Sequence, residues 1–484
     1  MTQTPSRSRR TRLGLAAPLL LAAMHACGEP APPDAPDSSG SPGSSDSLRQ
    51  AAFQPCSAAP APTALCAGAS CPIVGDVLLT CPQAPSQLAA VPGDAAQDYL
   101  LLTFSESVSS TSLRRQLVRL GPSAVLGSFT DPVPASSRAV QLVRSRTGAP
   151  ALLSTETTGL TVRTLSGSAF QTELVPNTDK LGDPLAVAAL STGGTAALLL
   201  DPAASPSTFS AGAAAALVQQ GTGGWSVARG FLAGTGFALA GDSLGRAHAL
   251  ARTPDSTGSS SAVLRHRIGG TEPVHSLGTP VGWSESGSST LAVPGGTSPP
   301  IPVLSDASGG KVALYGSLSL PSFSPIATLG QRADACTGDT TQCSACTSTT
   351  CTASGESVDS HAMATAPDGT VWVAYAKSNL DYTYGFTTKV TDFLFWKSCS
   401  CIESVRTDDR RRTTVLVLER LRLTAGAPVH EVRFQAALPE ATGASRAALT
   451  TLKLSAQGSL LQLTYQPRES DKQVRRLLFD LGKL

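Results

Sequence analysis

The chain has 484 residues, a formal net charge of +2 and only 15% charged residues. A balance this close to neutral creates no strong positive field, so we expect no nucleic-acid partner. The 44 glycines and 35 prolines, with few aromatic residues, favour many tight turns between short strands over a helical protein. The length suits one large all-β domain or two or three ordinary ones.

Residues 1–26 have the features of an export signal. Four arginines between positions 7 and 12 precede the apolar run Leu13–Ala23, which is too short to span a bilayer. A small residue followed by Cys27 resembles the lipobox of bacterial lipoproteins. The resemblance implies that Cys27 carries a lipid, that the preceding peptide is removed, and that the membrane is a partner through this anchor. Since Gly28 is not a retention-type residue, we expect the cell envelope, at the outer membrane or cell surface.

Cysteine usage agrees with export. The chain has eleven cysteines, and setting Cys27 aside leaves ten, an even number that can form five disulfides in an oxidising compartment. Zinc is the alternative for a group that contains Cys343-Ser-Ala-Cys346, but oxidation after export competes with thiolate ligation, so we expect neither a metal nor a cofactor. The disulfide candidates are Cys56, Cys66, Cys71, Cys81, Cys336, Cys343, Cys346, Cys351, Cys399 and Cys401.

Composition divides the rest of the chain into three parts. Residues 27–50 contain almost nothing that can be buried, so they are predicted to be a disordered tether rich in Pro, Ser and Gly. Residues 51–85 hold four cysteines and are predicted to be a small Cys-rich segment, whose pairing the sequence leaves open among three connectivities. Residues 86–484 are predicted to be the main domain, with a Cys-rich insertion near 332–355.

A hairpin pattern recurs along the main domain. Two short apolar strands flank three to five turn residues that contain Gly, which supplies the positive φ that such turns need. The clearest copies pair Ala186–Leu190 with Ala196–Leu200, Phe237–Ala240 with Ala247–Leu250, Ala362–Thr365 with Val371–Tyr375, and Leu452–Leu454 with Leu460–Leu463.

The spacing of the turn glycines indicates the architecture. Gly148 and Gly194 are 46 residues apart, and Gly194 and Gly245 are 51 apart. A period of this length, with strands that are apolar on both faces, is typical of β-propeller blades. The predicted fold class is therefore all-β, a β-propeller of about seven blades; tandem β-sandwich domains are the alternative.

The octapeptide from Asp368 to Tyr375 is similar to the D-G-x-x-W-V-A pattern in the blades of many secreted propellers. It also resembles, at Gly369 and Trp372 alone, the Asp-box of sialidase-type propellers. The resemblance implies the propeller fold. It implies no particular activity, because one fold carries many functions.

The string Gly241-Asp242-Ser243-Leu244-Gly245 satisfies both the G-x-S-x-G pattern and the G-D-S-L string of a class of esterases. The nucleophile role of Ser243 would require a strand-to-helix elbow or a partnering Asp-x-x-His, and the sequence contains neither signal. The string also falls where other repeats place a turn. We therefore predict a hairpin turn and no catalytic residue here.

Histidines and tryptophans are better explained by structure than by chemistry. No two histidines have metal-ligand spacing, and His248 and His361 lie in or beside apolar strands, where a hydrogen-bonded structural role is expected. The tryptophans are expected to fill the core between blades rather than line a binding site. The residues concerned are His248, His266, His275, His361, His430, Trp225, Trp283, Trp372 and Trp396.

These features predict a noncatalytic surface or periplasmic lipoprotein that binds a protein or glycan, or acts as a scaffold. The first alternative is a propeller-based hydrolase of sialidase or esterase type. The second is a purely structural envelope component. Enzymatic activity stays open, with absence favoured, and no residue is singled out as catalytic.

Overall fold

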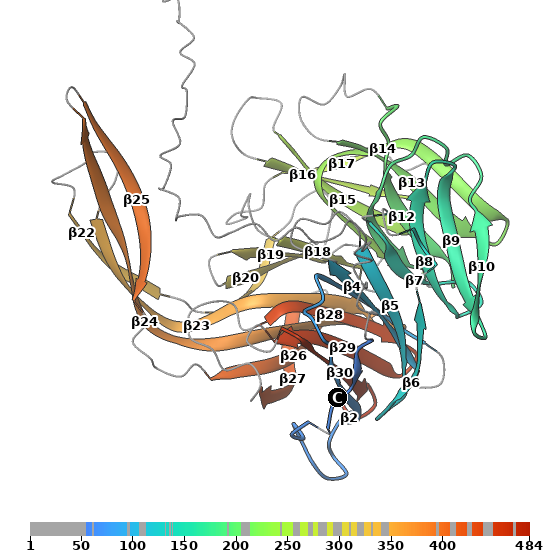
Figure 1. Cartoon of the computed structure of the whole chain (residues 1–484), viewed down its shortest axis with the longest axis horizontal. Coiled ribbons are helices and arrows are strands. Elements are labelled where there is room, and N and C mark those ends of the chain that lie inside the picture. Colours follow the sequence, from blue (N-terminus) through green and yellow to red (C-terminus); the bar gives the residue numbers. More distant parts are fainter. Residues whose placement is uncertain are drawn as a thin grey trace, which may run out of the picture. The chain divides into compact units, whose positions relative to one another are not determined.

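The computed structural model shows an all-β protein. It describes residues 55–484 apart from 61, 94–96, 106–112, 131, 135–136, 138, 191–192, 205–212, 243, 255–261, 270–273, 279–287, 294–302, 309–310, 317–323, 331–332, 340–347, 394–395, 407–412, 424–427, 439–448 and 468–470. For most strand residues in 254–266, 275–289, 303–327, 333–357 and 379–406 the backbone alone is described. Every regular element in these ranges is a strand (Figure 1). Within them, no helix is long and apolar enough to cross a membrane.

The strands pair antiparallel in six hydrogen-bonded sheets. Three sheets have four strands each: β3 (Gln87–Pro92), β4 (Asp98–Ser105), β5 (Leu113–Leu120) and β6 (Val125–Thr130); β7 (Gln141–Arg144), β8 (Pro150–Glu156), β9 (Gly159–Ser166) and β10 (Ala169–Leu174); β18 (Ser288–Ala292), β19 (Val303–Ser308), β20 (Lys311–Gly316) and β21 (Ser324–Leu329).

The other three sheets are larger. The seven-stranded sheet contains β11 (Pro184–Ala189), β12 (Thr195–Leu200), β13 (Ala213–Gly221), β14 (Gly224–Gly241), β15 (Ala247–Pro254), β16 (Ala262–Ile268) and β17 (His275–Gly278). The six-stranded sheet contains β22 (Ala333–Asp339), β23 (Ser348–Thr365), β24 (Val371–Phe393), β25 (Trp396–Arg406), β26 (Thr414–Leu423) and β27 (Pro428–Ala437). The five-stranded sheet contains β1 (Ser57–Ala58), β2 (Ile73–Thr80), β28 (Leu449–Gln457), β29 (Leu460–Pro467) and β30 (Gln473–Asp480).

Strand β14 belongs to two groups of strands. Its first part, from Gly224 to Gly234, pairs with β13. Its second part, from Thr235 to Gly241, pairs with β15. Gly234 and Gly236 have φ values of 148° and 59° at the change of partner, a conformation that side chains with a Cβ rarely adopt. The seven-stranded sheet is therefore two four-stranded groups that share one long, bent strand.

Most groups of strands pack against a neighbouring group on both faces. In β12, Ala197 and Leu199 pack with β8 and β9, whereas Ala196 and Leu198 pack with β15. Further cores join β2 and β30 to β4 and β5, β4 and β5 to β7 and β8, β20 to β24, and β24 and β26 to β29 and β30. Strands such as β12 are apolar on both faces because both faces are buried.

The two ends of the described chain meet in one sheet. Strand β2 pairs with β30 over residues Ile73 to Thr80, so a strand from the start of the chain completes the sheet of its last strands (Figure 1). Two ion pairs accompany this pairing. Arg475 donates to both carboxylate oxygens of Asp76 at 3.0 and 2.6 Å, and Nε of Arg476 lies 3.2 Å from Oδ2 of Asp98 on β4.

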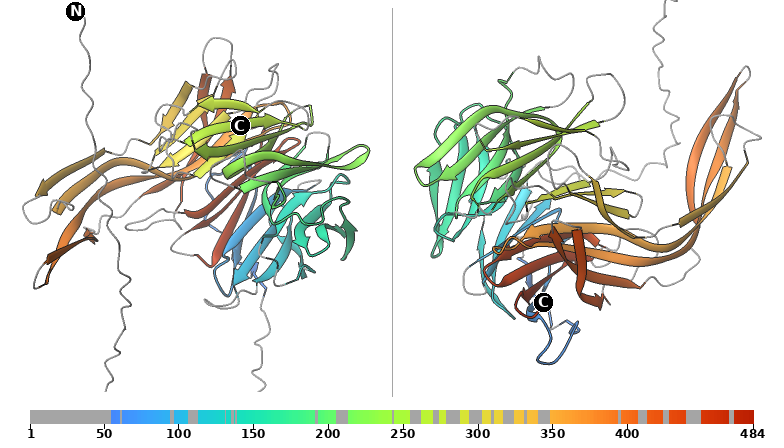
Figure 2. Two further views of the ribbon diagram at one scale, coloured as in Figure 1. Left: turned by 90° about the horizontal axis from the view of Figure 1, so that it is seen from above. Right: turned by 180° about the vertical axis from the view of Figure 1, so that it is seen from behind.

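Strand β2 also bears on the predicted domain boundaries. It lies inside the segment 51–85, which the sequence sets apart as Cys-rich, yet it is hydrogen-bonded into the sheet of the C-terminal strands. The insertion near 332–355 holds β22 and the start of β23, with Cys336 directly opposite Cys351 in their register. Figure 2 shows the long hairpin of β23 and β24, in orange, from two further sides. Residues 1–50, with the predicted signal, Cys27 and tether, lie outside the described residues.

The predicted fold class is confirmed at the level of an all-β propeller arrangement. The groups of strands pack face to face from β2 and β30 through β4, β8 and β12 to β15, and again from β20 through β24 to β29 and β30, which favours a propeller over tandem β-sandwich domains. The predicted number of blades, seven, is not confirmed, since an arrangement of five blades is detected.

Candidate functional site

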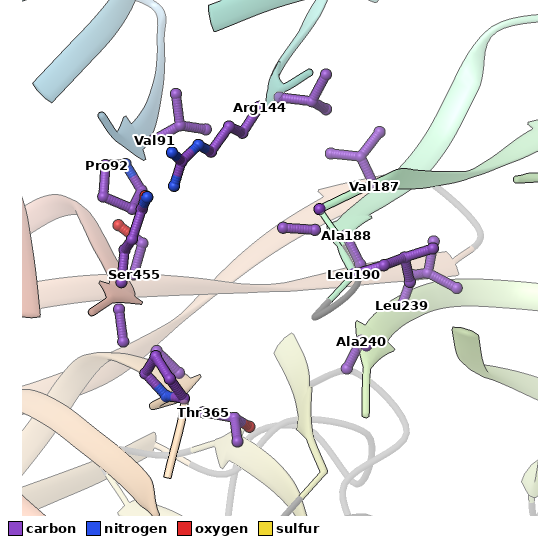
Figure 3. A pocket seen from close by; sticks show the side chains of 18 of the residues that line it. Val91, Pro92, Arg144, Val187, Ala188, Leu190, Leu239, Ala240, Thr365 and Ser455 are labelled. Atoms are coloured by element: carbon purple, nitrogen blue, oxygen red, sulfur yellow. The ribbon is translucent and has the colours of Figure 1, made fainter. Parts of the chain in front are cut away.

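The first strands of successive groups surround a cavity of about 690 Å³. Its lining comes from seven strands and the turns that follow them: β3, β7, β11, the second part of β14, β18, β23 and β28. The volume lies within the range of about 300–1,000 Å³ that is typical of small-molecule sites. The cavity is therefore a candidate ligand site (Figure 3).

The seven lining strands contact one another in a closed order. Strand β3 contacts β7, β7 contacts β11, and β11 contacts β14. Strand β14 contacts β18, β18 contacts β23, β23 contacts β28, and β28 returns to β3. A closed ring of inner strands makes a cavity on the axis of the arrangement, where every group of strands contributes to the wall.

A repeated turn connects the inner strand to the second strand in several groups. In the turn 242–246, the Asp242 amide donates to the Arg246 carbonyl and the Gly245 amide donates to the Asp242 carbonyl. The same two bonds occur in turns 145–149, 190–194 and 366–370. The fourth residue of each turn is a glycine with φ between 76° and 87°: Gly148, Gly193, Gly245 and Gly369. This is the geometry of hairpin loops that need glycine in the left-handed region.

Most of the cavity wall is apolar and built from small side chains. Figure 3 shows Val187, Ala188, Leu190, Leu239 and Ala240 on one side of the cavity. Because alanine and valine occupy little volume, these positions leave space at the axis that larger side chains would fill.

The opposite side of the cavity carries polar groups. Arg144, at the end of β7, lies there with Val91, Pro92 and Ser455 in Figure 3. The Nε of Arg144 donates to the Gly148 carbonyl at 3.1 Å, a bond that ties the start of the side chain to the turn. The wall therefore presents a guanidinium group across from an apolar surface.

Asp242 is the carboxylate among the described lining residues, and it is fully engaged by its own turn. Its Oδ1 accepts hydrogen bonds from the amides of Leu244 at 2.9 Å and Arg246 at 2.8 Å. Its Oδ2 accepts from Nε of Arg246 at 2.8 Å and lies 3.0 Å from Nε2 of His248. Burial alone would raise the pKa of Asp242, but these hydrogen bonds outweigh it and lower the pKa. The carboxylate therefore organises the turn.

The described histidines fit structural roles. His248 is fully buried, and burial lowers its pKa although the bond to Asp242 opposes the change. Burial lowers the pKa of His361 to about 4. His430 is half exposed, with Nδ1 3.3 Å from Oε2 of Glu419. Side chains of His266 and His275 lie outside the described residues. Among those described, no group of three or more His, Cys, Asp and Glu side chains is arranged to hold a metal.

The other residues that the sequence singled out have different surroundings in the structure. Trp372 is buried in the core between β24 and β29, as predicted. Trp225 packs partly against a core and donates from Nε1 to Glu173 at 2.9 Å. Asp368 accepts hydrogen bonds from the amide and hydroxyl of Thr370, so it shapes the turn before β24. Ser243, Trp283 and the side chain of Trp396 lie outside the described residues.

Two disulfides are described. Cys56 is joined to Cys81 and Cys66 to Cys71, which selects one of the three connectivities open to the first group. The side chains of the other candidates, Cys336, Cys343, Cys346, Cys351, Cys399 and Cys401, lie outside the described residues.

Sequence reasoning missed the cavity. Its lining residues are mostly Ala, Val, Leu and Gly, and such residues form no chemical motif. The one available signal was the Ala-rich character of the first strand of several hairpins, for example Ala186–Leu190. That signal marks small side chains but cannot show that they share an axis.

Comparisons with known proteins found weak likeness to solved structures and no match of other kinds. No family model matches the chain, and no curated protein matches it. Among solved structures, the chain is similar to a GH43_12 protein retrieved from a capybara gut metagenome, with 9% identity, a TM-score of 0.26, and coverage of 84% of this chain and 98% of that one. It is also similar to a β-fructofuranosidase from Schwanniomyces occidentalis complexed with fructosyl-erythritol, with 7% identity, a TM-score of 0.25, and coverage of 84% and 94%. Likeness at these TM-scores carries no argument about function.

Proposed function

We propose that this chain is a noncatalytic binding protein that holds a small ligand in the axial cavity of a propeller. The observation that carries the proposal is a cavity of about 690 Å³ with a largely apolar wall, whose described carboxylate, Asp242, accepts three hydrogen bonds within its own turn and lies 3.0 Å from Nε2 of His248 on β15. A carboxylate committed in this way is a poor candidate for acid–base or nucleophilic work, whereas apolar walls with few polar groups are typical of ligand sites.

We also propose that the propeller has seven blades. Support comes from β14, whose two parts pair with different strands, so that the six sheets contain seven groups of four strands. The closed order of contacts among β3, β7, β11, β14, β18, β23 and β28 gives the same number. Strand β2 then supplies the outer strand of the seventh blade.

The proposed location is the cell envelope, with a lipid on Cys27 and residues 27–50 as a tether. The disulfides Cys56–Cys81 and Cys66–Cys71 support export, because such bonds persist in oxidising compartments.

Radiolabelled palmitate should be incorporated into the wild-type chain, and this labelling should be lost in Cys27→Ala. Unchanged labelling in Cys27→Ala would contradict the assignment. We also propose that the loops of the blades bind a protein or glycan partner.

Fluorescence of the neutral apolar probe N-phenyl-1-naphthylamine tests ligand binding. We expect saturable binding to the wild type. Ala188→Trp should weaken it, because the indole occupies part of the cavity, whereas the control Val432→Trp, at a position 54% exposed on the outer strand β27, should keep it. Equal binding by all three proteins, or no binding by any, would contradict the proposal.

A propeller-based hydrolase is the second candidate. The names of the two similar solved structures point to it rather than to the binding protein, although their TM-scores of 0.26 and 0.25 give it no weight here. Glycosidic and ester substrates incubated with the mature protein distinguish the candidates. We expect no turnover. Turnover that Asp242→Asn or Ser243→Ala abolishes would establish the hydrolase instead.

A further inference from the structure

Strands β22 and β23 bring two cysteines opposite each other. Cys336 on β22 and Cys351 on β23 are partners in an antiparallel register that continues without a shift along the whole of β22. Directly opposite residues of an antiparallel pair share one face of the sheet, and their Cα atoms are about 4.5 or 5.5 Å apart. A disulfide needs a Cα separation of about 4.4–6.8 Å. The backbone therefore places these two cysteines within bonding range.

The first disulfide of the chain has the same arrangement. Ser57 on β1 is opposite Thr80 on β2, so the next pair outward in this register is Cys56 and Cys81. These two residues are bonded, and their Cα atoms are 4.1 Å apart. Cysteines that are directly opposite across two antiparallel strands therefore already form one disulfide in this protein.

The two remaining cysteines whose backbone is described lie too far from Cys351. Cys399 and Cys401 are on β25, and over Thr383 to Phe386 strand β24 has β23 along one edge and β25 along the other. Neighbouring strands are about 4.7–4.9 Å apart, so β23 and β25 are separated by about 9–10 Å. A disulfide does not form beyond a Cα separation of about 7 Å unless the backbone moves. Among these described positions, Cys336 is therefore the partner within reach of Cys351.

We propose that Cys336 and Cys351 are joined by a disulfide that fastens β22 to β23. The pairing rests on the proposed location outside the cytoplasm, where disulfides persist. As the S–S bond forms, the two thiols give up two protons and two electrons, and a disulfide oxidant of the exporting compartment takes them up to become two thiols. The bond fixes the register of the two strands, because a slip by one residue would place every residue of β22 on the opposite face of the sheet.

Mapping of free thiols in protein purified from the envelope of an export-competent bacterial host tests the bond. N-ethylmaleimide marks free thiols under denaturing, non-reducing conditions, and the protease Asp-N then separates residues 334–338 from 339–358. In the wild type we expect no label on Cys336 or Cys351, and a linked species that contains both peptides and is split by reduction. Cys351→Ser should expose Cys336 to complete labelling, whereas the matched control Cys343→Ser should leave Cys336 unlabelled.

The outcomes separate the pairing from the location. A free thiol at Cys336 or Cys351 in the wild type, or an unlabelled Cys336 in Cys351→Ser, would overturn the pairing. The bonds Cys56–Cys81 and Cys66–Cys71 are read in the same experiment. If these two bonds are present while Cys336 is free, the pairing alone is wrong. If all six cysteines are free, the proposed location fails together with the pairing.

Discussion

At the scale of single residues, Asp242 lies in a sequence string that resembles a catalytic motif, but its hydrogen bonds give it a structural role in a turn. It is 3% exposed, and its two oxygens satisfy two backbone amides, a guanidinium and a buried imidazole. A buried donor that loses its acceptor costs about 1–3 kcal/mol. Asp368 occupies the same kind of turn but is exposed to water, which replaces lost hydrogen bonds.

We predict that Asp242→Ala lowers the free energy of unfolding by about 2–4 kcal/mol, because it leaves several buried donors unpaired. Asp368→Ala should cost about 1 kcal/mol or less, since its partners reach water. Urea denaturation of both variants measures the difference. Equal losses in the two variants would contradict the structural role of Asp242.

The burial of Asp98 beside Arg476 makes stability depend on pH. Both side chains are almost fully buried, and burial raises the pKa of Asp98 to about 6 although the charge of Arg476 and a backbone hydrogen bond from Gly93 oppose the rise. A carboxyl with a raised folded-state pKa stabilises the fold fully below its unfolded pKa of about 4 and loses that contribution as the pH rises to about 6.

The expected loss for this group is about 3 kcal/mol between pH 4 and 6, from a shift of about two pKa units. In Asp98→Asn this part of the pH dependence of the unfolding free energy should disappear. The control Asp471→Asn, at an exposed position, should keep it. Unfolding free energies at several pH values provide the comparison. A wild-type pH dependence that Asp98→Asn leaves unchanged would show that Asp98 is not the titrating group.

At the scale of elements, the two disulfides hold loops of different length in place. Cys56 and Cys81 are 25 residues apart and both lie in the core beside β2, whereas Cys66 and Cys71 are five residues apart. Closing a longer loop removes more conformational entropy from the unfolded chain.

Loop length therefore predicts unequal losses of stability. Replacing Cys56 and Cys81 by alanine should cost about 3.5 kcal/mol, and replacing Cys66 and Cys71 should cost about 2 kcal/mol. Thermal unfolding of the two double variants under identical conditions gives the order. A larger loss from the short loop would contradict the assigned pairing or its energetic basis.

Hairpins could be predicted from the sequence because their information is local. Gly193, Gly245 and Gly369 each mark a turn whose φ requires glycine, and the flanking strands lie where the pattern placed them. The pairing of β2 with β30 joins residues about 400 positions apart, and no local pattern encodes such a partner. The shared strand β14 and the small-residue wall of the cavity were missed for the same reason: each depends on what lies opposite in the fold.

At the scale of the whole molecule, the proposed site depends on closure of the ring of inner strands. The inner strands contact one another in a ring that β28 and β3 close, and β2 with β30 packs the last sheet on β4 and β5 at the same junction. The buried ion pairs of Arg475 with Asp76 and of Arg476 with Asp98 lie at this junction. Unpairing β2 would remove its share of the packing between the last sheet and β4 and β5.

Hydrogen–deuterium exchange with mass spectrometry tests closure directly on the unmodified protein. We expect the amides of β2, from Ile73 to Thr80, to be as strongly protected as those of β30. Both should lose protection together as denaturant is added, since they share hydrogen bonds in one sheet. If β2 exchanged at the rate of an unstructured chain while β28 to β30 stayed protected, the closed ring and the cavity it encloses would both be wrong.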